Sequence, residues 1–181
     1  MIASDDRGQK APIQQMAKID HIDRAIVDLL MEDGRMPAAE ISRRMGDEVS
    51  ERAVRYRIDR MVKEGLITLS AIPNPRLLGF QVVADVFIEV EPSQIGEVAR
   101  LLAEQEKVSY VACSIGERDV SIQVVAHDLA EFYTYVTEVV GKLPGVRKTT
   151  SSIVPITLKD LHQWHIPKSL ASSAPDSPPK G

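Results

Sequence analysis

Aromatic side chains, cysteines and long apolar runs are all scarce in this chain of 181 residues. Phe, Trp and Tyr make up 4% of the residues, which argues against a base-stacking platform for single-stranded nucleic acid. The one cysteine, Cys113, excludes an intrachain disulfide and a CxxC zinc site, and it fits a reducing compartment. Because no stretch of about 18 apolar residues occurs and residues 2–10 are polar, we expect no membrane span and no signal peptide. These absences favour a cytoplasmic protein.

Motifs of the common enzyme classes are also missing. The sequence contains no Walker loop, GxGxxG, GxSxG or HExxH. His162 and His165 are three residues apart without a clear third ligand, and two imidazoles do not make a zinc site. We therefore expect no catalytic residue, no cofactor and no metal. We interpret the two histidines as surface residues, Trp164 as a packing residue and Cys113 as inert packing.

A basic helix stands out against the acidic composition. The chain has a net charge of −4, yet residues 50–63 carry five basic side chains and only two acidic ones. At helical spacing the apolar side comprises Val54, Ile58, Met61 and Val62. The other side and its flanks carry the candidate DNA contacts, which are Ser50, Arg52, Arg55, Tyr56, Arg57, Arg60 and Lys63. We expect Arg52, Tyr56 and Arg60 to face bases, and the remaining cations to meet phosphates.

The region around this helix predicts a helix-turn-helix. Residues 19–67 contain three short helical patterns, with Asp20 and Ser50 as N-caps of the first and third, and Gly65 as the end of the third. The short second connection places the third helix in the recognition position. A purely structural bundle is the alternative, and the arginine content of the third helix favours DNA binding. Alternation over residues 66–72 predicts a short strand that would complete a winged domain.

The second half of the chain alternates strands and helices. The expected strands are 81–91, 108–115, 120–126 and 146–158, and the expected helices are 93–105 and 129–143. This βαββαβ order is the ferredoxin-like plan, in which both helices cover one face of an antiparallel sheet. The fold class is therefore α+β, with an N-terminal winged helix-turn-helix domain joined to a C-terminal ferredoxin-like domain.

The same patterns divide the chain into five segments. They are a flexible arm at 1–17, a DNA-binding domain at 18–67, a strand and linker at 68–79, a dimerisation and effector-sensing domain at 80–160, and an extension with a disordered tail at 161–181. Val83 and Phe87 lie on the sheet face that no helix covers. Packing against a second copy would bury them, so we expect a homodimer or a higher homo-oligomer with an interface at these residues.

Five motifs in order resemble the Lrp/AsnC family of feast/famine regulators. Residues 19–35 are similar to LDxxDxxILxxLxxDGR, residues 54–67 to VxxRIxRLxxxGVI, residues 74–80 to xPxxLGF, residues 114–119 to the TGxxD turn, and residues 143–146 to LPGV. The resemblance implies a transcriptional regulator whose N-terminal domain binds double-stranded DNA. It further implies that the C-terminal domain assembles dimers and often binds an amino acid between them. This chain departs from the pattern in a longer turn before the third helix, in Ile115 at the usual Thr, and in a 162–165 extension outside the family core.

The TGxxD-like turn is the candidate effector site, with Ser114, Gly116, Glu117, Arg118 and Asp119. An amino acid offers an ammonium for Asp119 or Glu117 and a carboxylate for Arg118 or turn amides. The alternative is a plain hairpin turn with solvated charges. The alternative function for the whole protein is a small-molecule-sensing module that regulates an enzyme through protein contact. That function would leave the basic helix without a purpose.

Overall fold

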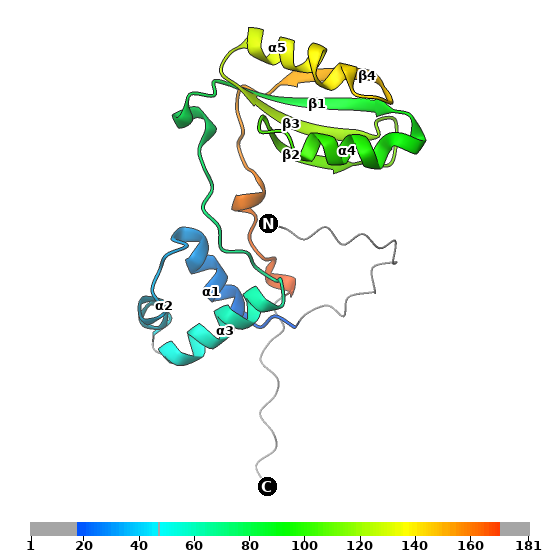
Figure 1. Cartoon of the computed structure of the whole chain (residues 1–181). Helices are drawn as coiled ribbons and strands as arrows, with labels where there is room; N and C mark the ends of the chain where they lie inside the picture. Colours follow the sequence, from blue (N-terminus) through cyan, green and yellow to red (C-terminus); the bar gives the residue numbers. More distant parts are fainter. Residues whose placement is uncertain (1–17, 47, 171–181) are drawn as a thin grey trace. The chain divides into compact units, whose positions relative to one another are not determined.

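The computed structural model describes residues 18–46 and 48–170, and it contains two compact units (Figure 1). The helical unit comprises the described residues up to Ala71 together with those from Lys159 onward. The sheet unit comprises Ile72–Leu158. The arm predicted at 1–17 and the tail from 171 onward lie outside the described residues.

Three helices form the body of the helical unit: α1 (His21–Glu32), α2 (Ala38–Arg44) and α3 (Glu51–Lys63). The two predicted N-caps are confirmed. Asp20 accepts a hydrogen bond from the Asp23 amide at 2.8 Å, and Ser50 accepts one from the Ala53 amide at 3.3 Å. Gly65, with φ of 71°, follows α3 in the left-handed conformation that glycine adopts without strain.

The helical core is small and mostly aliphatic. Its buried members are Ile26, Val27, Leu30, Met36, Ile41, Val49, Val54 and Met61. The prediction that Val62 belongs to the apolar side of α3 is wrong, since its side chain is 44% exposed. Val62 lies one residue beyond Met61 and so about 100° further round the helix, outside the narrow strip that Val54 and Met61 present to the core.

The strand predicted at residues 66–72 is absent. The backbone from Ile67 to Asn74 has no regular secondary structure, and a 3₁₀ turn, η1 (Pro75–Leu78), follows it. Leu66 and Ile67 pack against the helical core, whereas Leu69 and Ile72 are exposed. A strand requires a partner for its backbone groups, and the four-stranded sheet described below does not include this segment.

The sheet unit has the predicted βαββαβ order. Its elements are β1 (Val82–Val90), α4 (Ile95–Ala103), β2 (Val108–Cys113), β3 (Val120–Ala126), α5 (Leu129–Glu138) and β4 (Val146–Ile153). The strands pair antiparallel in the order β2-β3-β1-β4, and both helices cover the same face (Figure 1). The last strand ends at Ile153 rather than at 158, and a 3₁₀ turn η3 (Val140–Lys142) replaces the last turn expected for α5.

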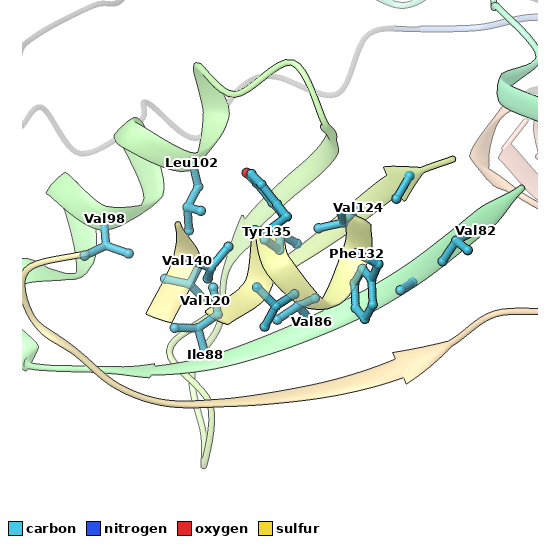
Figure 2. Packing of buried hydrophobic residues seen from close by; sticks show 14 of the residues in the cluster. Val82, Val86, Ile88, Val98, Leu102, Val120, Val124, Phe132, Tyr135 and Val140 are labelled. Carbon is cyan, nitrogen blue, oxygen red and sulfur yellow. The ribbon is translucent and has the colours of Figure 1, made fainter. Parts of the chain in front are cut away.

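The core of the sheet unit lies between this face and the helices (Figure 2). Alternate residues of β1 from Val82 to Val90 are buried, and they meet Leu102 of α4 and Phe132 of α5. Tyr133 of α5 is 70% exposed. It is adjacent in sequence to Phe132 and therefore points about 100° away from the core. Cys113, expected to be packed, is exposed at the end of β2.

Candidate nucleic-acid interface

One side of α3 presents a strip of polar side chains to solvent. Arg52, Tyr56, Asp59 and Lys63 are all exposed and recur at intervals of three or four residues, so they share one helical side. Tyr56 is 69% exposed, although it is a large aromatic residue. Arg55 is also exposed and forms an ion pair with Glu51 one turn earlier. This strip could meet a polyanion without any rearrangement of the core.

Arg57 and Arg60 are placed differently from the sequence-based expectation. Arg57 Nη1 lies 2.8 Å from an Asp20 oxygen and 2.7 Å from Asp23 Oδ1, and Arg60 Nη2 lies 2.6 Å from Asp23 Oδ2. Both guanidinium groups are therefore turned toward α1. This corrects the prediction that Arg60 faces away from the core among base-reading residues, and it removes Arg57 from the freely available cations.

The carboxylate that receives both arginines is buried. The Asp23 side chain is 1% exposed, whereas the Arg57 side chain is 23% exposed and the Arg60 side chain 28%. Burying a carboxylate is costly unless it is paired, and two bidentate-capable cations provide that pairing here. The three side chains, with Asp20, form what we call the acid–arginine cluster. It joins the start of α1 to the middle of α3 and fixes how the two helices cross.

Burial and pairing act in opposite directions on the pKa values in this cluster. Burial alone would raise the pKa of Asp20, but the Asp23 amide and the Arg57 guanidinium outweigh it and hold this pKa below its ordinary value. Burial would lower the pKa of Arg57, but hydrogen bonds to Asp23 and Asp20 outweigh it and raise the value. Asp20 and Arg57 are therefore ionised throughout the neutral range.

The connection before α3 is fixed by a second buried polar group. The Ser42 hydroxyl on α2 donates a hydrogen bond to the Val49 carbonyl at 2.7 Å, and both residues are buried. Residues 45–50 separate α2 from α3, as the longer turn expected from the sequence requires. Ser50 lies at the end of this turn, is exposed, and uses its oxygen to cap α3.

The candidate effector turn lies between β2 and β3, and Asp119 holds it in place. The Asp119 carboxylate accepts a hydrogen bond from the Val90 amide at 2.8 Å, and its carbonyl accepts one from the Ser114 amide at 2.8 Å. Gly116, Glu117 and Arg118 are exposed at the tip, and Gly116 has a φ of 147°. The carboxylate thus already serves the hairpin, while the charged tip remains available to a ligand.

The turn also reaches the uncovered face of the sheet. The Arg118 guanidinium carbon lies 4.2 Å from the centre of the Phe87 ring, which is a cation–π distance. Phe87 and Val83 are half-buried on this face. Tyr110 on β2 is 57% exposed, and the neighbouring Gln123 amide donates to Asp85 at 3.2 Å. The candidate effector residues and the candidate interface residues are therefore neighbours, which the sequence did not indicate.

The described segments contain neither a metal-binding cluster nor a membrane-spanning helix. Nowhere in residues 18–46 and 48–170 do three His, Cys, Asp or Glu side chains gather as a metal site would require. Within those same segments, we find no helix with the length and apolar character needed to span a membrane.

Comparison with protein families gives two matches that together span both units. Residues 19–62 match the AsnC-type helix-turn-helix domain, and residues 83–164 match the Lrp/AsnC ligand binding domain. The second match runs to Trp164, so part of the extension that the sequence placed outside the family core lies within it.

Individual relatives agree with these matches. An uncharacterized HTH-type transcriptional regulator of Pyrococcus horikoshii is 38% identical over 144 residues, which cover 79% of this chain and 90% of the relative. The HTH-type transcriptional regulator LrpA of the same organism is 32% identical, over 78% of this chain and 99% of LrpA. Among solved structures, E. coli AsnC has a TM-score of 0.72 at 22% identity, covering 80% of this chain and 97% of AsnC. A transcriptional regulator from Neisseria meningitidis in complex with L-Met also has a TM-score of 0.72, at 21% identity, covering 79% of this chain and 94% of the regulator. The two structures support the fold.

Proposed function

This chain belongs to the Lrp/AsnC family of DNA-binding transcriptional regulators, and we propose that it contacts duplex DNA with the exposed strip of α3. Arg52 and Tyr56 are the proposed base-reading residues. Arg55 and Lys63 are proposed to meet phosphates, and Ser50 keeps a hydroxyl proton that it can donate to one. The observation that carries this assignment is the division of the α3 cations into an exposed set and a set bound to α1.

The first experiment measures binding to a duplex from the region upstream of the protein's own gene, by mobility shift. Arg52→Ala should weaken binding by about 1–3 kcal/mol, because a side chain that contacts a base edge is lost. Arg35→Ala is the matched control, since that side chain is 95% exposed in the same unit but lies outside α3. Lys63→Ala should reduce the slope of log affinity against log salt concentration by about one, because one phosphate contact is lost. Unchanged affinity in Arg52→Ala, Tyr56→Ala and Lys63→Ala would exclude this side of α3.

We propose that two copies pair through the uncovered face of the sheet unit. Val83, Phe87 and Tyr110 give this face an apolar part, and burying it against a second copy removes that area from water. In sedimentation velocity of the full chain, Phe87→Glu should shift the protein toward monomer. Tyr133→Glu is the control, because it introduces the same charge at an aromatic residue that is 70% exposed on α5, which covers the opposite face of the sheet. A monomeric wild type would contradict the pairing.

We propose an amino acid as the effector, bound at the turn of residues 114–119. The match to a ligand-binding domain supports an effector, and the exposed Glu117 and Arg118 offer one charge of each sign for a zwitterion. Calorimetry with the common amino acids should give heat for at least one of them. Asp119→Ala should abolish it by releasing the turn from Val90, whereas Glu106→Ala, an exposed carboxylate elsewhere in the unit, should not. No heat from any amino acid would mean that the turn is structural.

We also propose that the protein acts in the cytoplasm as a regulator of transcription and not as an enzyme. The relatives are regulators by name, and the helix-turn-helix match accounts for the basic helix. Regulation of an enzyme through protein contact, the alternative from the sequence, would leave the exposed cations of α3 without a role.

A further inference from the structure

The segment after the sheet unit returns to the helical unit. Residues 159–170 cluster with α1, α2 and α3, although the whole sheet unit separates them in the sequence. The helical unit is therefore built from two pieces of chain, and the sheet unit is joined to it at both of its ends, near Ala71 and near Lys159. We call residues 159–170 the C-terminal tether.

Side-chain and backbone contacts attach the C-terminal tether to α1. Ile166 is partly buried and packs against the helical core. Its carbonyl accepts a hydrogen bond from Arg24 Nε at 3.1 Å. His165 Nδ1 lies 2.9 Å from Asp28 Oδ1, and Arg24 bridges back to Asp28 at 3.1 Å. An apolar anchor flanked by polar contacts is the arrangement of a specific docking site rather than of a chain passing over a surface.

The tether has local order that prepares it for docking. Asp160 and Gln163 form a capping box around the 3₁₀ turn η4 (Leu161–Gln163), and a second 3₁₀ turn, η5 (Lys168–Leu170), follows Ile166. These turns restrict the chain on both sides of the anchor. Less conformational entropy is then lost when Ile166 enters the helical core.

We infer that the C-terminal tether positions the DNA-binding helix α3 relative to the sheet unit, with Ile166 as the positioning residue. A helical unit held by two chain connections has fewer orientations than one held by a single linker. The tether binds α1, and α1 in turn holds α3 through the acid–arginine cluster. In a dimer, this restriction raises the effective concentration of the second α3 at its half-site once the first has bound. This inference rests on the proposed dimeric DNA binding.

The first arm of the test follows docking without DNA. Trp164 is the only tryptophan in the chain and lies two residues before Ile166, so its emission reports on the tether. In the full chain, Ile166→Asp should raise the acrylamide quenching of Trp164 above the wild-type value, because a charged aspartate cannot replace the packing of the partly buried isoleucine against the helical core. Ile166→Val, the conservative control, should keep the wild-type level of Trp164 quenching. Equal quenching in wild type and Ile166→Asp would overturn the docking.

The second arm compares two duplexes that the wild-type protein selects from a random pool, one with two half-sites and one with a single half-site. Ile166→Asp should bind the two-site duplex about three- to tenfold more weakly and the single-site duplex with wild-type affinity. A chain ending at Asp160 should behave in the same way, and a chain ending at Leu170 should behave as wild type. Unchanged two-site affinity, or an equal loss on both duplexes, would overturn the positioning role.

The two arms separate this inference from the proposed function. If the wild-type chain selects no duplex, the proposed DNA binding fails, whereas the quenching arm still decides whether the tether docks. If selection succeeds and Ile166→Asp loses affinity for the two-site duplex alone, the result supports both the proposed DNA binding and the positioning role of the C-terminal tether. A merely stabilising role for Ile166 would weaken binding to both duplexes alike.

Discussion

The two units are stabilised in different ways. The core of the sheet unit has fifteen buried apolar residues, and the described residues of that unit include no buried charged side chain. The helical core has eight, and it adds the buried carboxylate of Asp23 and the buried hydroxyl of Ser42. A sheet obtains its geometry from backbone pairing between strands. Three short helices have no such ladder between them, so directional side-chain contacts set their angles.

The apolar core of the sheet unit mainly stabilises that unit, whereas the acid–arginine cluster mainly positions α3 against α1. Replacing a buried ion pair with apolar residues often leaves stability unchanged, so the acid–arginine cluster is weak evidence for stability as such. Its geometry is specific, however, because one carboxylate receives two arginines from successive turns of α3. We therefore expect the helical unit to lose orientation when this cluster is changed, and the sheet unit to lose stability when its apolar core is changed.

We expect the greatest loss of stability from a change in the core of the sheet unit. Leu102→Ala should lower the free energy of unfolding by about 3–5 kcal/mol, because a fully buried side chain is replaced by a cavity. Urea unfolding followed by circular dichroism measures this loss. Leu158→Ala is the matched control, since that leucine is 91% exposed, and it should change stability by less than about 0.5 kcal/mol. Equal losses in the two variants would contradict the assigned core.

A somewhat smaller loss is expected in the helical unit. Asp23→Ala should destabilise it by about 2–3 kcal/mol, since Arg57 and Arg60 lose their shared partner but can regain part of their hydration. Asp59→Ala, which removes an exposed carboxylate from α3, is the control. Asp23→Ala should also weaken DNA binding although Asp23 itself is buried away from any ligand. Retained affinity would show that the cluster does not orient α3.

A weaker change is expected in how the stability of the sheet unit depends on pH. Hydrogen bonds from the Lys107 ammonium, the His127 amide and the His127 ring lower the pKa of Glu131 from 4.5 to about 2. A carboxylate with a depressed pKa in the folded state stabilises that state above pH 4.5, and the contribution is lost as the pH falls toward 2. Glu131→Gln should therefore flatten the fall in stability over this window, measured by thermal melts. Lys107→Met should flatten it in part, and an unchanged slope in both would contradict the pKa shift.

Local patterns were sufficient for much of the fold. The caps at Asp20 and Ser50, the alternation along β1 and the βαββαβ order all follow from interactions between residues close in sequence or from period-two burial. The strand expected at 66–72 shows where such patterns fail. Alternation is a necessary feature of a paired strand, but pairing depends on whether another strand lies alongside.

The candidate interface was predictable only in part. Helical spacing placed Arg52, Tyr56 and Lys63 on one exposed side of α3. It did not show that Arg57 and Arg60 turn to α1, although Asp20 and Asp23 have the same spacing of three residues as the two arginines. That matched spacing was the available signal. Without the fold, nothing indicated that the two pairs meet.

The amino-acid sequence was enough to predict a helix-turn-helix followed by a βαββαβ sheet, the helix that carries the basic side chains and the face of the sheet left without a helix. These properties depend on residue periodicity, capping and turn chemistry, which act over a few residues. The folded structure was needed to show that Arg57 and Arg60 turn to α1, that Arg118 lies over Phe87, and that Ile166 packs on the helical core. These contacts join residues far apart in the sequence, up to 142 positions for Arg24 and Ile166, and they depend on the three-dimensional path of the chain, which local periodicity does not encode.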